Sequence, residues 1–321
     1  MDVVYMDAYG REIGILPWVE GDFTIGKSNT FELKVPKNLG IEQDYRLAID
    51  GQEYGGIIDG VDIDTSADYI TVSGRTWHGM LQNRIIRPNS GQDYYTVSGD
   101  VNTILATLIE RLDLSLCLAA SEVLSGHTVS NYQFERYVDA YTGIRAMLTS
   151  IGCKLHIEYD PSLCRAVLSA VERGSYIDDG VDGDQIDFEI GKTRPVNHLI
   201  GMGKGELKDR AIVDVYADAK GNVSETQTLF GNQLKEETYE AANSEADKLK
   251  EDTIKKLQEY QKNLSTCEMK DVDGDNYDID DIVGGVYAEQ NITVTTSIAQ
   301  KIASIKGKVL TVQTNTENEV V

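Results

Sequence analysis

Alternating apolar and polar residues mark the first 76 residues of the chain. Phe31, Leu33 and Val35 alternate with Glu32 and Lys34, which is the pattern of a strand with one buried and one solvated face. Asp50-Gly51 lies between two such runs and predicts a hairpin turn. Further strands are predicted at Val3–Met6, Tyr45–Ile49, Gly56–Ile58 and Tyr69–Val72. This part of the chain is therefore predicted to be a β domain.

The apolar residues then change to helical spacing. Trp77–Ile86 predicts a short helix that Pro88 ends. Asp100–Leu112 predicts a helix with an aspartate cap and an apolar stripe, and Tyr141–Ile151 predicts another amphipathic helix. Such stripes are typical of a protein core, and no function is assigned to them.

Residues 89–184 are predicted to form a mixed α/β domain, because strands follow these helices. Cys153–Tyr159 alternates with period two, and Asp160-Pro161 predicts a turn into a return strand at Cys164–Val171. Within the first of these strands, Cys153 and His156 are close enough to suggest a nucleophile and its base. Their odd and even positions point to opposite faces, so the pair is not assigned a catalytic role.

The third region contains a glycine-rich segment between two predicted strands, Leu199-Ile200 and Ala211–Ala217. Gly201, Gly203 and Gly205 alternate, and Lys204 is followed by glycine rather than by Ser or Thr. This spacing fits neither the phosphate-binding loop of nucleotide hydrolases nor the dinucleotide fingerprint. Glycines at alternate strand positions instead favour close approach of another backbone, and we expect packing against a partner chain.

Two further elements are predicted in this region. The turn Asp218–Asn222 should connect Ala211–Ala217 to a strand that begins at Val223. Residues 236–264 contain no Gly or Pro and carry apolar residues at steps of three and four, which predicts a long helix with a narrow apolar seam.

Composition excludes several classes of protein. The 321 residues are 41% hydrophobic, which suits a globular chain of about two domains, and no apolar run approaches the ~20 residues of a membrane span. Met1–Asp7 has no basic or long apolar stretch, so no signal peptide is expected. The net charge of −23, from 53 acids and 30 bases, argues against binding nucleic acid through its phosphates.

No catalytic, cofactor-binding or metal-binding residue is assigned from the sequence. The cysteines at 117, 153, 164 and 267 lack Cys-x-x-Cys spacing and are expected to be reduced, and the histidines at 78, 127, 156 and 198 form no zinc motif. The acidic stretches Asp271–Asp275 and Asp178–Asp184 resemble calcium loops in composition only. The first has Asn276 and Ile282 where the calcium motif needs Gly and Glu, so both stretches are interpreted as turns.

Several segments resemble the tail-hub, or baseplate-hub, proteins of long-tailed bacteriophages. They are Asn197-His-Leu-Ile with the following Gly-Lys-Gly-Glu-Leu-Lys-Asp-Arg210, Tyr277–Gly284 with the strand-like Ile292–Thr296, and the N-terminal Ile57–Gly60 and Ile70–Arg75. Their order and spacing carry the resemblance more than any single motif does. Ile57–Val61 followed by Ile70–Val72 also parallels Ile282–Val286 followed by Ile292–Val294, as duplicated barrels would.

The resemblance implies an α+β, mainly β fold with two similar β-barrel, tail-tube-like domains. Residues 1–88 would form the first barrel, residues 89–184 an inserted α/β domain, and residues 185–321 a second barrel interrupted by the helix at 236–264. It also implies a homotrimer, without cofactors, in a virion tail tip or baseplate, made in the bacterial host cytoplasm.

The implied partners are a tail-tube or distal-tail protein, a spike or lysin protein and a tape-measure protein, with no membrane anchor and with DNA only as passing cargo. The acidic charge would suit a conduit through which DNA passes. Two other functions stay open: a tail-associated peptidoglycan hydrolase, and a carbohydrate-binding adhesion module, for which Asp93-Tyr94-Tyr95 is the one aromatic cluster in the sequence.

Overall fold

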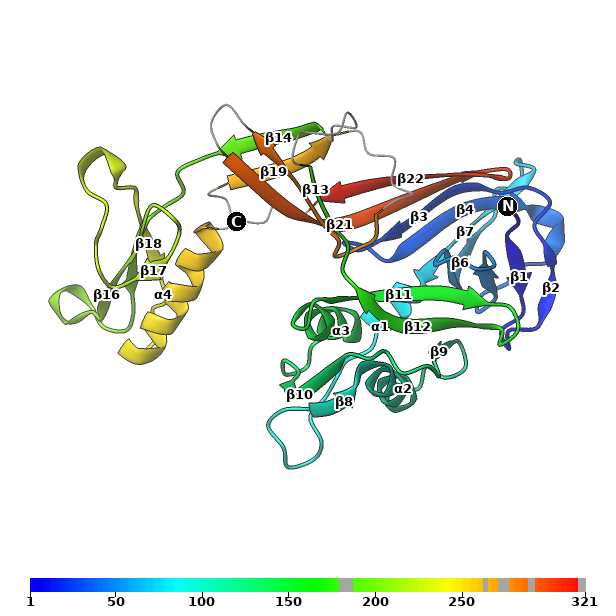
Figure 1. Ribbon diagram of the computed structural model, residues 1–321, viewed down its shortest axis with the longest axis horizontal. Helices are drawn as coiled ribbons and strands as arrows, with labels where there is room; N and C mark the ends of the chain where they lie inside the picture. The colour runs from blue at the N-terminus through cyan, green and yellow to red at the C-terminus, as the bar shows by residue number, and fades with distance from the viewer. Residues whose placement is uncertain (179–186, 262–264, 271–276, 288–291, 317–321) are drawn as a thin grey trace. The chain divides into compact units, whose positions relative to one another are not determined.

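The computed structural model describes residues 1–178, 187–261, 265–270, 277–287 and 292–316 (Figure 1). The chain divides into two compact units. The first unit consists of Met1–Tyr176, Val272–Ile282 and Ser297–Asn315, and the second of Ile177–Asp271, Val283–Thr296 and Thr316–Val321. The unit boundaries fall within β13 (Ser175–Asp178), β20 (Ile282–Tyr287), β21 (Ile292–Lys306) and the end of β22 (Val309–Thr316), so these strands are shared by the two units. Strands make up more of the described chain than helices do, which confirms the mainly β, α+β class.

The first unit contains an extended antiparallel sheet. Its strands follow the order β22-β21-β3-β4-β7-β6-β5-β1-β2. Their bounds are Val4–Met6 (β1), Glu12–Ile15 (β2), Glu20–Ile25 (β3), Thr30–Pro36 (β4), Arg46–Ala48 (β5), Gly55–Asp62 (β6), Tyr69–Thr76 (β7), Ile292–Lys306 (β21) and Val309–Thr316 (β22). The described strands do not close into a barrel, so the two predicted barrels are not confirmed.

The alternation on β4 is confirmed, because Phe31, Leu33 and Val35 are buried while Glu32 and Lys34 are exposed. The turn at Asp50-Gly51 is confirmed too, with Gly51 at a φ of 67°. The C-terminal strand β21 pairs with β3, Lys301 lying opposite Ile25 and Lys306 opposite Glu20. The sheet of the first unit therefore requires residues from both ends of the chain.

Between residues 77 and 172 the first unit continues as an α/β module. Its helices are α1 (Trp77–Gln82), α2 (Val101–Arg111) and α3 (Ala140–Thr149), and its strands are β8 (Thr96–Asp100), β9 (Leu118–Ala120), β10 (Thr128–Gln133), β11 (Cys153–Asp160) and β12 (Arg165–Glu172). Asp100 caps α2 by accepting from the backbone N–H groups of Asn102 and Thr103, as predicted. Trp77 stacks on Tyr159 at 6.0 Å in a core shared with the sheet.

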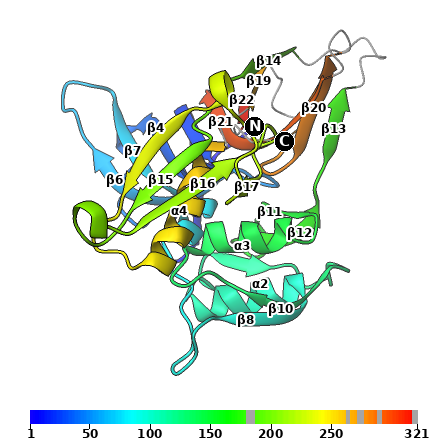
Figure 2. The ribbon, with the colours of Figure 1, turned by 90° about the vertical axis from the view of Figure 1, so that its left-hand side faces the viewer.

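The second unit contains a small sheet covered on one face by a helix. The order is β17-β16-β15-β18. The bounds are His198–Met202 (β15), Ile212–Ala217 (β16), Val223–Ser224 (β17), Glu236–Glu240 (β18) and Ala246–Gln261 (α4), and a separate pair is formed by β14 (Asp187–Lys192) and β19 (Ser265–Lys270). Leu199, Val215 and Leu257 form the core between sheet and helix, and Figure 2 shows α4 beside β15 and β16.

The helix predicted at residues 236–264 is wrong at its start. Glu236–Glu240 forms strand β18, which pairs in parallel with β15, and α4 begins only at Ala246. Ladder hydrogen bonds to a neighbouring strand outweigh the moderate helix propensity of Glu-Glu-Thr-Tyr-Glu. Residues 262–264 lie outside the described part of the chain.

Short 3-10 helices occupy Lys37–Leu39, Leu207–Asp209 and Gly231–Gln233. Within the described residues, no helix is both long enough and apolar enough to span a membrane.

Candidate functional site

A partly buried cluster of charged side chains joins parts of the first unit that are far apart in the sequence. Lys154 lies on β11, and its Nζ is 2.7 Å from Asp278 Oδ2 and 2.8 Å from Asp281 Oδ2. Lys301 lies on β21, and its Nζ is 3.0 Å from Asp278 Oδ1 and 2.6 Å from Glu53 Oε1. The two lysines thus share Asp278, and each has a second carboxylate of its own.

Backbone groups complete the coordination of Asp281. Its Oδ1 accepts from the Gly174 N–H at 2.6 Å, and its Oδ2 accepts from the Asp278 N–H at 2.8 Å. The Asp281 side chain is only 1% exposed, so these bonds replace water at every side. Asp281 therefore closes the turn at 278–281 through the Asp278 N–H, and it joins this turn to Gly174, which follows β12.

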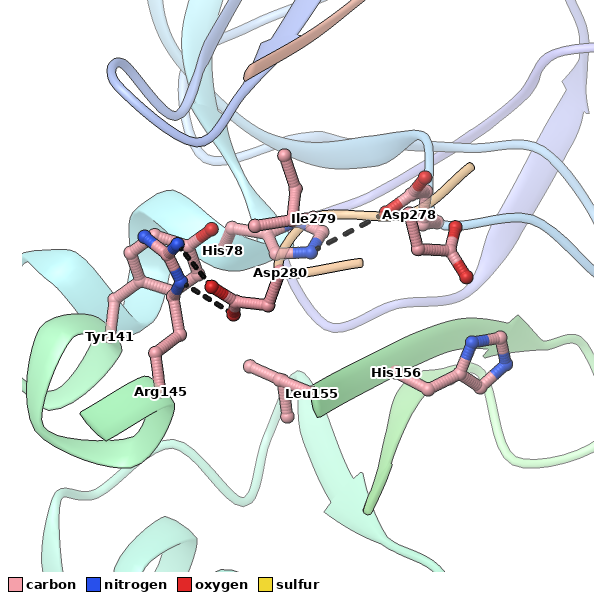
Figure 3. Close-up of a pocket in the computed structure, with 9 residues that line it drawn as sticks. His78, Tyr141, Arg145, Leu155, His156, Asp278, Ile279 and Asp280 are labelled. Carbon is pink, nitrogen blue, oxygen red and sulfur yellow. Dashed lines mark hydrogen bonds and ion pairs between the residues drawn. The ribbon is translucent and has the colours of Figure 1, made fainter. Parts of the chain in front are cut away.

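Asp280 makes a third connection, shown in Figure 3. Arg145 on α3 donates to it through Nε at 2.9 Å and through an Nη at 2.6 Å, the two-pronged geometry that suits a guanidinium and a carboxylate. Arg173 Nε also donates to the Asp280 backbone oxygen at 2.6 Å. The three aspartates of Tyr277–Gly284 thus contact β11, α3, β21 and the segment after β12.

Lys154 departs from the alternation predicted for its strand. The other even positions of Cys153–Tyr159, His156 and Glu158, are partly and fully exposed. Lys154 is nevertheless buried, because the 278–281 turn covers it with two carboxylates. A lysine can be buried at low cost only with such partners.

The electrostatics of the cluster keep its members charged. Burial opposes ionisation of Asp278, but Lys301 and Lys154 outweigh it and lower the pKa of this carboxyl to about 2. Burial likewise opposes the charged form of Lys301, while Glu53, Tyr54 and Asp278 raise its pKa above the ordinary value. The pKa of Lys154 is raised by Asp278 and Asp281 against its burial. None of these three groups is poised to transfer a proton near neutral pH.

A small cavity lies beside the cluster, lined among others by His78, Tyr141, Asp278 and Asp280 (Figure 3). Its volume is about 10 Å³, the scale of one water molecule. His78 Nε2 lies 3.6 Å from Glu53 Oε2. Burial lowers the pKa of His78 to about 4 despite Glu53, so its ring is neutral at pH 7. The cavity is too small for a sugar or a peptide, and the geometry is that of a structural clamp.

The alternating glycines accommodate an element of the same chain. A Cβ atom at Gly201 would lie 2.2 Å from Thr253 Oγ1, and one at Gly203 would lie 2.8 Å from Leu249 Cδ2, both residues being on α4. The prediction that a partner chain packs against these glycines is therefore wrong. At Gly203 a Cβ atom would also lie 2.7 Å from the backbone oxygen of Ser244, whereas at Gly201 the nearest atoms all belong to the Thr253 side chain. The expected close approach of a backbone is therefore found at Gly203 and not at Gly201.

Other residues considered in the sequence do not come together as sites. Cys153 is buried, whereas His156 is partly exposed and lies 3.6 Å from Glu158 on the same strand. The acidic stretch 271–275 and residues 179–184 of the other stretch lie outside the described residues. Within the part of the chain that the structure describes, no group of three or more His, Cys, Asp or Glu residues could hold a metal ion.

Sequence reasoning missed the ion cluster itself. Glu53, Lys154 and Lys301 are separated by about a hundred residues or more in the chain, and nothing local marks them as partners. The local signal is the density of aspartates in Asp278-Ile-Asp-Asp281, which indicates that several cationic partners are needed but does not identify them.

No protein-family model matches the sequence, and no curated protein sequence matches it. Among solved structures, the chain is similar to the 43 kDa tail protein of prophage MuSo2 from Shewanella oneidensis, with 14% identity, 98% of each chain covered and a TM-score of 0.49. It is also similar to prophage tail protein gp18 from Listeria monocytogenes, with 12% identity, 100% of this chain and 95% of that chain covered and a TM-score of 0.49.

A third similar structure is a chain of the phage P2 baseplate, with 12% identity, 99% of this chain and 98% of that chain covered and a TM-score of 0.47. These structural neighbours are prophage tail proteins and a phage baseplate, the group that the sequence motifs resemble. At such identities the likeness concerns the fold alone.

Proposed function

We propose that this chain is the structural hub of a phage tail tip or baseplate, or of a phage-derived tail-like particle. It would join the tail tube to a spike or lysin at the distal end. The observation that carries the proposal concerns Tyr277–Gly284, one of the segments that resemble tail-hub proteins. Its aspartates bind basic residues of β11, α3 and β21. These contacts rigidify a frame, and none of them presents a reactive group to a substrate.

In this proposal the hub is a homotrimer with two barrel-like domains per chain, so that three chains supply six. Residues 1–88 and 185–321 would contribute the barrels and residues 89–184 the insertion between them, a division that stays a prediction. The partners would be a tail-tube or distal-tail protein on one side and a spike or lysin protein on the other. The net charge of −23 would keep passing DNA from adhering to the assembly.

Light scattering over a range of protein concentrations tests the proposal. A stable species with three times the 35.5 kDa mass of the chain is the expected result. If the chain is a monomer at every concentration, a second assay, its effect on susceptible cell walls, decides between a structural hub and a peptidoglycan hydrolase. Loss of turbidity of those walls on adding the purified chain would contradict a purely structural hub and favour a peptidoglycan hydrolase.

A further inference from the structure

The loop between β15 and β16 in the second unit is held in one conformation by bonds at its base. The Gly203 N–H donates to the Ala211 oxygen at 2.8 Å, and the Ala211 N–H donates to the Lys204 oxygen at 2.9 Å. Lys204 also donates from its backbone to the Ser244 oxygen at 3.1 Å, and Arg210 Nε donates to the Gly203 oxygen at 3.1 Å. The loop is therefore a built feature, and not a loose connection.

This loop presents a leucine in an unfavourable way. Leu207 is 94% exposed, and its φ of 51° lies in the left-handed region. That region is rare for leucine, whereas glycine and asparagine adopt it readily. For folding alone, asparagine would suit this exposed left-handed position better than leucine. Such a combination points to a role in binding.

The strands that this loop connects, β15 and β16, carry apolar residues on the outer face of their sheet. Leu199 and Gly201 point toward α4, so Ile200 and Met202 lie on the opposite face of β15. Met202 pairs with Ile212 on β16, and Ile212 is 51% exposed. Among the described residues, α4 covers only the other face of this sheet. We call Ile200, Met202 and Ile212, together with Leu207 in the loop that joins their two strands, the outer apolar surface.

Carboxylates border the outer apolar surface. Asp214 Oδ1 lies 2.8 Å from His198 Nε2, and Glu236 Oε1 lies 2.6 Å from His198 Nδ1, so one imidazole serves two acids. Glu240 lies 2.8 Å from an Nη of Arg210. Each of the three carboxylates is about half or more exposed, with side-chain exposures of 48%, 54% and 66%. The border can therefore accept further cationic donors from a partner.

We propose that the outer apolar surface docks a different protein, one that offers an apolar pocket for Leu207 surrounded by lysine or arginine. A second copy of this chain is a poor occupant, because its own outer apolar surface would bring the same acidic border to the contact. The inference is independent of the hub function, since it rests only on contacts within the second unit.

Site-specific photo-crosslinking tests the proposal. A benzophenone side chain is introduced at Leu207 in cells that produce the chain with its natural partner proteins, and at exposed Lys220 in the β16–β17 turn as a matched control. The expected product is a crosslink from position 207, mapped by mass spectrometry to a Lys- or Arg-containing segment of another protein, at least ten times stronger than from position 220. A crosslink to a second copy, equal crosslinking from both positions, or none from position 207 would overturn the proposal.

Leu207→Asn separates binding from stability. Asparagine tolerates the left-handed backbone, so the melting temperature should stay the same or rise, while yield of the same partner in co-purification at matched expression should fall at least fivefold. A fall in both would indicate that Leu207 is structural, and unchanged partner yield would contradict its role as an anchor. If the crosslinked protein is not a tail component, the result supports the docking surface and contradicts the hub function. If the chain is found in virions but position 207 gives no crosslink, the result supports the hub function and overturns the docking surface.

Discussion

Replacing Asp281 by alanine should destabilise the first unit strongly. The change removes one carboxylate from Lys154, whose side chain is 9% exposed, and leaves the partly buried N–H groups of Gly174 and Asp278 without their acceptor. Removing one partner of a buried ion pair costs about 3–5 kcal/mol, and Lys154 retains Asp278, so we take about 3 kcal/mol for this part. The unpaired N–H groups add about 1 kcal/mol or more. The expected loss of unfolding free energy is therefore about 4 kcal/mol.

Urea unfolding followed by tryptophan fluorescence measures this loss selectively. Both tryptophans, Trp18 and Trp77, lie in the first unit, so the signal reports that unit alone. With a urea slope of about 2 kcal/mol per molar, the midpoint should fall by about 2 M. Asp281→Asn keeps an acceptor and should lose about half as much. Glu251→Ala removes a solvent-exposed ion pair with Lys255 and should leave the transition unchanged.

The reasoning fails if Asp281→Ala shifts the urea midpoint by less than about 0.5 M. It also fails if the asparagine and alanine variants are equally unstable, because the charge alone would then account for the effect.

Two further predictions concern acid stability and the packing of α4. The pKa of His78 is lowered to about 4 in the folded state, so only the unfolded state takes up this proton between pH 6.5 and 4. Stability should fall over that window by about 3 kcal/mol as pH decreases, and pH-dependent urea titrations of His78→Gln should lack this component; equal slopes in both proteins would refute it. Gly201→Ala should cost about 1–3 kcal/mol in the thermal unfolding of the second unit, because its methyl group meets Thr253 Oγ1 at 2.2 Å. Adding Thr253→Ala should recover part of the loss, and no recovery would mean that the contact is not the cause.

The sequence predicted correctly those strands, helix ends and turns that are determined by residues close together in the chain. The alternation of Phe31, Leu33 and Val35 gave β4, and the Asp100 side chain gave the start of α2 within one residue. The β16–β17 turn formed as expected, because Asp218 accepts from the N–H groups of Lys220 and Asn222. In each case the residues that decide the structure lie within a few positions of one another.

The errors and omissions arise where a distant segment decides. Lys154 follows the spacing of a solvent-facing residue and becomes buried because residues 278–281 cover it. Glu236–Glu240 has a composition suited to a helix and forms a strand because β15 offers a parallel edge. The alternation of Gly203 with its neighbouring glycines predicts a close contact, but Leu249, which makes it together with Ser244, lies 46 positions away on α4. The spacing of apolar residues within a short stretch of sequence cannot show which distant segment will pack against it.

The ion cluster also determines which parts of the chain can fold independently. A fragment of residues 1–176 would keep β11 and Glu53 but lose Asp278, Asp281 and Lys301, so Lys154 would remain in an apolar position without either of its carboxylates. The same fragment would lose β21, and β3 would become an exposed edge. The chain departs from the first unit after Tyr176 and must return before that unit is complete. The second unit is discontinuous as well, because it consists of Ile177–Asp271, Val283–Thr296 and Thr316–Val321, so neither unit corresponds to a single stretch of the chain.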